Sequence, residues 1–123
     1  WPGMLDKMRA KIGNRPLMVT EFGAGAIPGC HSLEGDAYWS EERQRKVLTG
    51  SIRELLARND LVGFYVWQFF DTRSDGALAL RRPRGYNNKG LLDEYRRPKL
   101  AYYAVRDLLT EARASLPHPR RLP

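Results

Sequence analysis

Glu21 is the side chain of this sequence whose position most suggests chemistry. It ends the apolar run 17–20 and is followed two residues later by Gly23. Strands of parallel α/β folds are covered on both faces, so the first polar side chain after an apolar run marks the solvent-facing end, where barrel enzymes keep catalytic groups. The alternative is that Glu21 caps a turn or pairs with one of the many arginines.

The cysteine and the histidines offer little other chemistry. The single Cys30 excludes an internal disulfide, and one cysteine with His31 and His118 is too few ligands for a zinc site. Neighbouring residues of a strand point in opposite directions, which disfavours Cys30 and His31 as a nucleophile pair. We therefore expect no metal, no redox role and no cofactor.

The chain is basic, with 21 Lys and Arg against 14 Asp and Glu and a net charge of +7. The segment 81–99 holds seven basic and two acidic side chains. Nucleic-acid binders usually place such charge on one helix face or between stacking aromatics, whereas here it falls among Pro83, Gly85 and Pro98. The pattern disfavours a nucleic-acid partner.

Length and composition predict one modest globular domain. The chain has 123 residues, of which 42% are hydrophobic, and no apolar run approaches the roughly 20 residues that span a bilayer. The start at Trp1, in place of a methionine, predicts a processed or truncated product. The lone cysteine and the lack of a signal peptide favour the cytoplasm.

Apolar spacing predicts five elements in the order helix, strand, helix, strand, helix. These are residues 4–12, 17–20, 40–56 and 61–71, followed by a helix that Pro98 opens. Ser40 supplies a cap at the start of the second helix. The expected core face of the last helix is formed by six residues: Leu100, Ala101, Ala104, Val105, Leu108 and Leu109.

A strand, a crossover helix and a second strand form a parallel βαβ unit. Two strands cannot close a sheet, and the second strand needs cover on both faces. We therefore expect an α/β fold that is the C-terminal portion of a (β/α)8 TIM barrel, as an incomplete fragment. Residues 1–115 would form this partial domain and residues 116–123 a flexible tail rich in Pro and Arg.

Ordered blocks of residues carry a resemblance from about Pro16 to Leu109. The chain resembles glycoside hydrolase family 2 and, within it, the catalytic barrel of β-glucuronidases. The blocks are Thr20-Glu21-Phe22-Gly23, Gly29-Cys30-His31-Ser32, Trp39-Ser40-Glu41-Glu42, Val66-Trp67-Gln68-Phe69, Asn87-Asn88-Lys89-Gly90 and Arg97-Pro98-Lys99.

The resemblance implies a retaining β-glycosidase with Glu21 as the nucleophile. A second carboxyl must protonate the leaving oxygen and later activate water. In the family this is the Glu of an Asn-Glu pair, and no such pair occurs in these 123 residues. We therefore expect the isolated chain to be inactive.

The resemblance also implies that Asn87 and Lys89 bind the carboxylate of the sugar, although the same residues suit a simple turn. Tyr86 and the second Asn depart from the usual pattern of that loop.

Trp67 would line the sugar pocket, with ordinary packing as the alternative. The position of His31 is equally compatible with a contact in the sugar pocket and with a structural role in a turn. Asp71 and Arg73 could form an ion pair that orders their loop, or contact sugar hydroxyls.

The expected partner is a carbohydrate, a β-glucuronide or another β-glycoside. A β-galactosidase-type hydrolase of family 2 and a non-catalytic basic remnant are the alternatives. The sequence does not decide which aglycone is accepted or whether the parent protein is a homo-oligomer.

Overall fold

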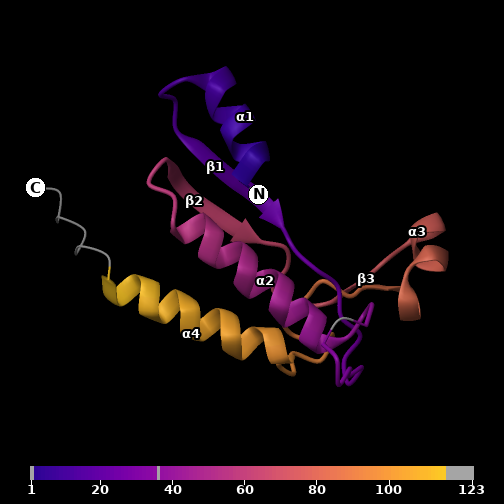
Figure 1. The fold of residues 1–123 in the computed structure, drawn as a ribbon. Helices are drawn as coiled ribbons and strands as arrows, with labels where there is room; N and C mark the ends of the chain where they lie inside the picture. Colours follow the sequence, from indigo (N-terminus) through magenta and orange to yellow (C-terminus); the bar gives the residue numbers. More distant parts are fainter. Residues whose placement is uncertain (1, 36, 116–123) are drawn as a thin grey trace, which may run out of the picture.

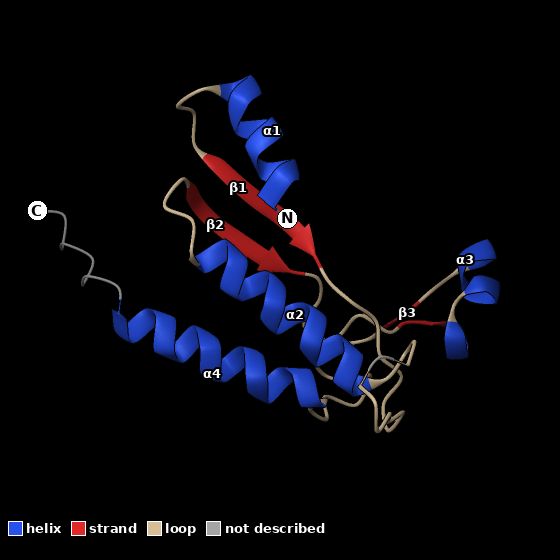
Figure 2. Cartoon of the chain, viewed as in Figure 1, coloured by secondary structure: helices blue, strands red, loops and turns tan. Residues whose placement is uncertain are grey.

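The computed structural model describes residues 2–35 and 37–115, so the predicted tail 116–123 lies outside the described residues. The elements follow the order α1 (Pro2–Ile12), β1 (Leu17–Phe22), α2 (Glu41–Leu56), β2 (Leu61–Val66), β3 (Thr72–Arg73), α3 (Gly76–Arg81), the 3₁₀ turn η1 (Pro83–Gly85), β4 (Tyr86–Asn87) and α4 (Leu100–Ser115). Figures 1 and 2 show β1 and β2 side by side, with α2 and α4 running along them.

Strands β1 and β2 pair in parallel, as the predicted βαβ unit requires. Leu17 lies opposite Leu61, and Val19 lies opposite Phe64. The register shifts twice along the pair, the second time between Val19 and Phe22. This shift lets Phe22 point into the core although the strict alternation of a strand would have placed Glu21 there.

The hydrophobic core lies on one face of this two-stranded sheet. Leu17 and Val19 of β1 pack there with buried side chains of three helices, namely Leu5 of α1, Leu48, Ile52 and Leu55 of α2, and Ala101 and Val105 of α4. On the other face Met18 and Val62 are exposed. The described residues therefore cover the sheet on one side only, as expected of a chain that supplies too little structure to cover both faces.

The helix boundaries agree with the capping signals of the sequence. Gly13 ends α1 with a φ of 61°, and its N–H donates to the carbonyl of Arg9 at 3.0 Å. Ser40 caps α2, because its hydroxyl accepts from the N–H of Arg43 at 3.2 Å. In α4 the predicted core face is correct for Ala101 and Val105, whereas Leu109 is 40% exposed.

The prediction that the second strand extends to Asp71 is wrong, because β2 ends at Val66. The N–H of Trp67 still donates to the carbonyl of Phe22, but that of Gln68 donates to Lys89 at 3.1 Å. Residues 68–71 then pair with the segment 89–92 in place of β1. Their apolar, aromatic character is equally compatible with this second pairing, so the sequence pattern could not place the end of the strand.

Residues 72–87 form an excursion that the sequence pattern did not predict. It contains the antiparallel pair β3 and β4, the six-residue helix α3 and the turn η1. Figure 1 shows α3 projecting away from the sheet and from the long helices. Two-residue strands have no periodicity that a sequence pattern could reveal.

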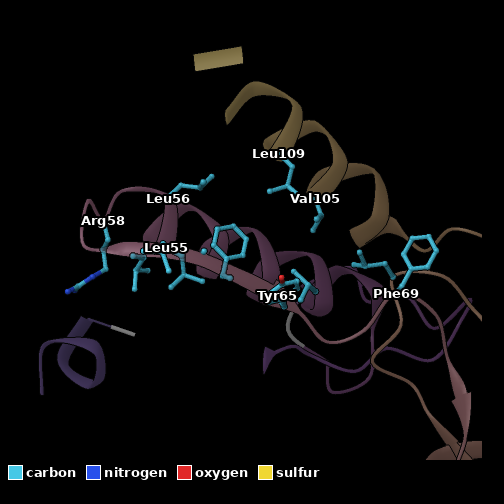
Figure 3. Close-up of a pocket in the computed structure, with 13 residues that line it drawn as sticks. Leu55, Leu56, Arg58, Tyr65, Phe69, Val105 and Leu109 are labelled. Atoms are coloured by element: carbon cyan, nitrogen blue, oxygen red, sulfur yellow. The ribbon is translucent and has the colours of Figure 1, made fainter. Parts of the chain in front are cut away.

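An apolar groove of about 610 Å³ runs along the outer edge of β2. Figure 3 shows Val105 and Leu109 of α4 on one side of it, with Leu55 and Tyr65 on the other. Within residues 2–35 and 37–115, β2 has β1 as its only strand partner, so its second edge is open. Among the same residues, no helix is both long and apolar enough to cross a membrane.

Candidate functional site

Glu21 lies at the C-terminal end of β1 with its side chain exposed to solvent. Its neighbours in the strand, Thr20 and Phe22, point to solvent and into the core, respectively. Within the described part of the chain, no hydrogen bond or ion pair engages the Glu21 carboxylate. The predicted turn cap or arginine pair is therefore not formed by these residues, and the carboxylate is free to meet a ligand.

Trp67 follows β2 at the same end of the sheet. Its N–H donates to the carbonyl of Phe22 at 2.7 Å, so the residue next to Glu21 is bonded directly to Trp67. Gly23 packs against the main-chain carbonyl of Trp67, where a side chain would not fit. Trp67 is 42% exposed, so this aromatic residue is partly accessible beside the end of β1.

Lys89 is brought to the same end of the sheet by the hydrogen bond between its carbonyl and the N–H of Gln68. Its side chain lines a hollow of about 460 Å³. Gly23 and Gly25, which follow β1, line the same hollow. Arg81 and Arg82 line the same hollow. The described lining carries several cations and no carboxylate, so its charge favours an anionic ligand.

Asn87 and Asn88 have different roles. The Asn87 side-chain oxygen accepts from Arg82 Nη1 at 3.3 Å, and its amide nitrogen has no partner among the described residues. Asn88 is fully buried, and its Nδ2 donates to the carbonyls of Pro83 and Tyr86, both at 2.9 Å. Asn88 therefore holds the turn, while Asn87 keeps a donor for a ligand.

His31 contacts the start of α2. Its Nδ1 lies 2.8 Å from Glu42 Oε1, and the other oxygen of Glu42 accepts from the N–H of Ser32 at 3.0 Å. The hydrogen bond to Glu42 raises the pKa of His31 above its ordinary value of 6.5. This contact fixes the loop 29–32 on α2, and a contact between His31 and sugar stays a prediction.

Asp71 forms its ion pair with Lys99, and no pair with Arg73 is seen. Oδ1 of Asp71 lies 2.9 Å from Lys99 Nζ, and both side chains are almost fully buried. The same oxygen accepts from the N–H of Gly90 at 2.8 Å. Of the two roles considered for Asp71, the structure thus supports the ion pair that orders a loop, with Lys99 as the partner.

Four buried polar residues that were not predicted as site residues hold the loops of this end together. Glu41 accepts from the N–H groups of Gly29 and Leu100 at 2.8 and 2.7 Å. Gln44 Nε2 donates to the carbonyls of Ala24 and Gly90 at 2.9 and 3.0 Å. Asp71 and Lys99 complete the set. Their burial depends on the tertiary fold. The only indication in the sequence is that Glu41 and Lys99 belong to ordered blocks that resemble the family.

Arg81 and Arg82 are the other residues that sequence reasoning missed. In the sequence they belong to a basic segment among turn residues, and in the structure they line the hollow next to Lys89. Arg84 of the same run pairs with Glu94 instead. The only signal in the sequence was the local excess of positive charge.

The arrangement combines an exposed carboxylate, a partly exposed tryptophan and a cationic hollow at one end of a parallel sheet. A carboxylate can attack an electrophilic carbon, an aromatic face can stack on a sugar ring, and cations can hold an anionic group.

Comparisons with known proteins give a consistent picture, although no family model matches the chain. A β-glucuronidase of Streptococcus agalactiae serotype V is 37% identical over 89 residues, which is 72% of this chain and 14% of that protein. A β-galacturonidase of glycoside hydrolase family 2 from Eisenbergiella tayi, solved bound to galacturonate, is 40% identical with a TM-score of 0.80 over 94% of this chain and 21% of that one.

A third relative is the β-glucuronidase of Bifidobacterium dentium, solved in complex with coumarin-3-O-glucuronide. It is 31% identical with a TM-score of 0.76, over 94% of this chain and 17% of that one. The similarity to family 2 glycoside hydrolases that the ordered blocks predicted is thereby confirmed in sequence and in fold. The chain spans between about one seventh and one fifth of the length of these relatives.

Proposed function

We propose that this chain, whose sequence and fold match those of family 2 glycoside hydrolases, is the nucleophile-bearing segment of a longer retaining β-glycosidase that hydrolyses β-glucuronides. One observation carries the proposal: the exposed carboxylate of Glu21, one residue before the end of β1, lies at the same end of the sheet as the cationic hollow of Lys89 and Arg82. Trp67, which is 42% exposed, lies between the two segments in the main-chain bonding: its N–H donates to Phe22, and the N–H of the next residue, Gln68, donates to Lys89.

In the proposed reaction, the Glu21 carboxylate attacks the anomeric carbon and displaces the aglycone oxygen, which takes a proton from a second carboxyl group. Water, deprotonated by that same group, then hydrolyses the glycosyl ester and restores Glu21. A retaining enzyme needs the two carboxyl groups about 5 to 5.5 Å apart. We place the second one in the part of the longer protein that this chain does not include.

Lys89 and Asn87 are the proposed ligands of the sugar carboxylate. Lys89 offers an ammonium group, and Asn87 offers the amide nitrogen that no described residue uses. Charge-assisted hydrogen bonds to a carboxylate are stronger than neutral ones, so a neutral sugar would bind less well. The galacturonate and glucuronide in two of the related structures are both uronic acid ligands, which supports an anionic sugar here.

The open edge of β2 supports the proposal that the chain closes a (β/α)8 barrel. The unpaired edge and the apolar groove beside it offer backbone hydrogen-bonding groups and an apolar surface to a further strand. In a complete barrel no strand edge remains free. We propose that a strand from the rest of the longer protein pairs with β2 and lies under Val105 and Leu109.

Covalent trapping tests the nucleophile. The full-length protein would be incubated with a 2-deoxy-2-fluoro-β-glucuronide that carries a good leaving group, digested and analysed by mass spectrometry. We expect the fluorosugar on the peptide that contains Glu21, and loss of turnover and labelling in Glu21→Gln. Glu111→Gln, an exposed carboxylate of α4, is the matched control. A label on another carboxylate, or activity that survives Glu21→Gln, would refute the assignment.

A substrate panel tests the proposed sugar. Because the related Eisenbergiella tayi structure is a β-galacturonidase, 4-nitrophenyl β-galacturonide is compared with the β-glucuronide and with the neutral β-galactoside and β-glucoside. Preference for either uronide supports the carboxylate site. Preference for a neutral sugar would favour the β-galactosidase-type alternative, and no turnover of any member would favour a non-catalytic remnant.

A further inference from the structure

Lys99 connects three segments that are far apart in the sequence. Its Nζ donates to the carbonyl of Ala26 at 2.8 Å, to Oδ1 of Asp71 at 2.9 Å and to the carbonyl of Asn88 at 3.2 Å. These acceptors belong to the segment after β1, the segment after β2 and the loop that carries Lys89. An ammonium group has three donors, and here all three are used inside the protein.

The ion pair holds Lys89 from both sides. On one side, the carbonyl of Asn88 accepts from Lys99. On the other, the N–H of Gly90 donates to Oδ1 of Asp71, the oxygen that also accepts from Lys99. The backbone of Lys89 therefore runs between two groups that are fixed by the same pair of charges.

The contacts at Gly90 leave little room for another arrangement. A β-carbon at this position would collide with the N–H of Asp71 and the carbonyl of Leu92. The main chain at Gly90, the residue after Lys89, thus lies directly against the segment that carries Asp71. Any movement of the Asp71 carboxylate would be transmitted to the loop.

Burial makes both charges depend on each other. Loss of solvent raises the pKa of Asp71 and lowers the pKa of Lys99, and in each case the hydrogen bond between the two opposes the effect of burial. Removing one partner leaves the other buried without its counter-charge, which is strongly unfavourable. The Asp71 carboxylate would then move or take up a proton, and Gly90 would lose its fixed acceptor.

We propose that Lys99 is a positioning residue for sugar recognition, which sets the place of Lys89 and Asn87 by holding Asn88 directly and Gly90 through Asp71. The inference rests on the proposed function, since it concerns the loop that would bind the carboxylate of a uronic acid. Lys99 itself touches no substrate, because its side chain is 1% exposed and its three donors are used.

The test compares Lys99→Met and Asp71→Asn in the full-length protein. Methionine keeps most of the volume of lysine without its donors, and asparagine keeps an oxygen for Gly90 without the charge. Ile52→Val is the control for a general loss of stability, because Ile52 is fully buried in the core on α2, away from the loop 87–90. KM and kcat are measured for 4-nitrophenyl β-glucuronide and for the neutral β-glucoside.

We expect Lys99→Met to raise the KM for the glucuronide by about tenfold, the range of one lost charge-assisted hydrogen bond, with little change for the glucoside. Asp71→Asn should act in the same direction, while Ile52→Val should leave the ratio between the two substrates unchanged. Equal losses on both substrates, or a ratio that Ile52→Val alters as much, would mean that Lys99 only stabilises the fold.

A second measurement does not depend on catalysis. Deuterium uptake of the peptide covering residues 86–91 should rise in Lys99→Met, with unchanged uptake in the peptide covering residues 48–55 of α2. Unchanged uptake at 86–91 would overturn the proposal whatever the kinetics. If the wild-type protein has no preference for uronides, the proposed sugar is wrong, and the uptake still decides whether Lys99 fixes the loop.

Discussion

Gly23 lies so close to the main-chain carbonyl of Trp67 that a β-carbon on Gly23 would overlap with this oxygen. The next bond along the chain, between the N–H of Trp67 and the carbonyl of Phe22, holds the two segments together. The glycine therefore permits the approach that puts Glu21 beside Trp67.

Gly23→Ala should be strongly destabilising, because the obstacle is backbone and cannot rotate away. We expect a loss of about 1 to 3 kcal/mol in the free energy of unfolding, as for overpacked sites, measured by urea denaturation followed by tryptophan fluorescence. Gly50→Ala is the control, since Gly50 lies inside α2 with open space around it and should gain about 0.5 to 1 kcal/mol. A neutral Gly23→Ala would contradict the close approach.

Removing the ammonium group of Lys89 should change the choice of sugar more than the chemical step. In the full-length protein, Lys89→Met is expected to lower kcat/KM for the β-glucuronide by roughly 10- to 100-fold, the worth of a hydrogen bond to a charged group. The β-glucoside should be cleaved as before. Lys11→Met, an exposed lysine of α1, serves as the control. Equal loss on both sugars would remove Lys89 from carboxylate recognition.

The contact between His31 and Glu42 should depend on pH in both directions. The pKa of His31 is raised above 6.5, chiefly by its hydrogen bond to Glu42, so the stability from its protonated form is present below 6.5 and lost as pH rises through the raised pKa. The pKa of Glu42 is lowered from 4.5: burial opposes the shift, and the hydrogen bond from His31 and those from backbone N–H groups outweigh it. Its contribution is therefore lost as pH falls through that lowered pKa.

An NMR titration of the imidazole signals measures this effect. We expect the His31 signal to titrate above 6.5 in the wild type and closer to 6.5 in Glu42→Gln. His31→Gln assigns the signal, because His118 is the only other histidine of the sequence. Unchanged titration in Glu42→Gln would show that the contact is not maintained in solution.

The purified 123-residue chain should not release 4-nitrophenol from its β-glucuronide. It contains the proposed nucleophile, but no Asn-Glu pair from which the family takes its proton donor. The assay is run beside the full-length protein at equal molar concentration. Turnover by the short chain that disappears in Glu21→Gln would place both carboxyl groups inside these residues and refute this expectation.

The apolar groove beside β2 should matter only when the rest of the protein is present. Leu109 lines it and is 40% exposed, so Leu109→Asp should change the stability of the isolated chain little and should destabilise the full-length protein. Tyr103→Asp is the matched control, since Tyr103 lies on the same helix outside the groove and is 46% exposed. Equal effects in both contexts would argue against a strand at this edge.

Local features of the fold could be predicted from the sequence because they depend on residues close together in the chain. The apolar spacing of α2 and α4, the cap at Ser40 and the stop at Gly13 are of this kind. The parallel pairing of β1 and β2 followed from the length of the helix between them. The end of β2 was predicted wrongly, since an aromatic run does not reveal which backbone it will pair with.

The sequence by itself determined that Glu21 lies near the C-terminal end of a strand, and its ordered blocks determined the similarity to family 2 glycoside hydrolases. Only the tertiary structure decided that Lys99 pairs with Asp71, that Asn88 holds its own turn and that Arg81 and Arg82 line the hollow of Lys89. Residues 28 positions apart acquire an ion pair only when burial removes water from both. Burial and long-range contact are properties of the folded chain, and no local spacing encodes them.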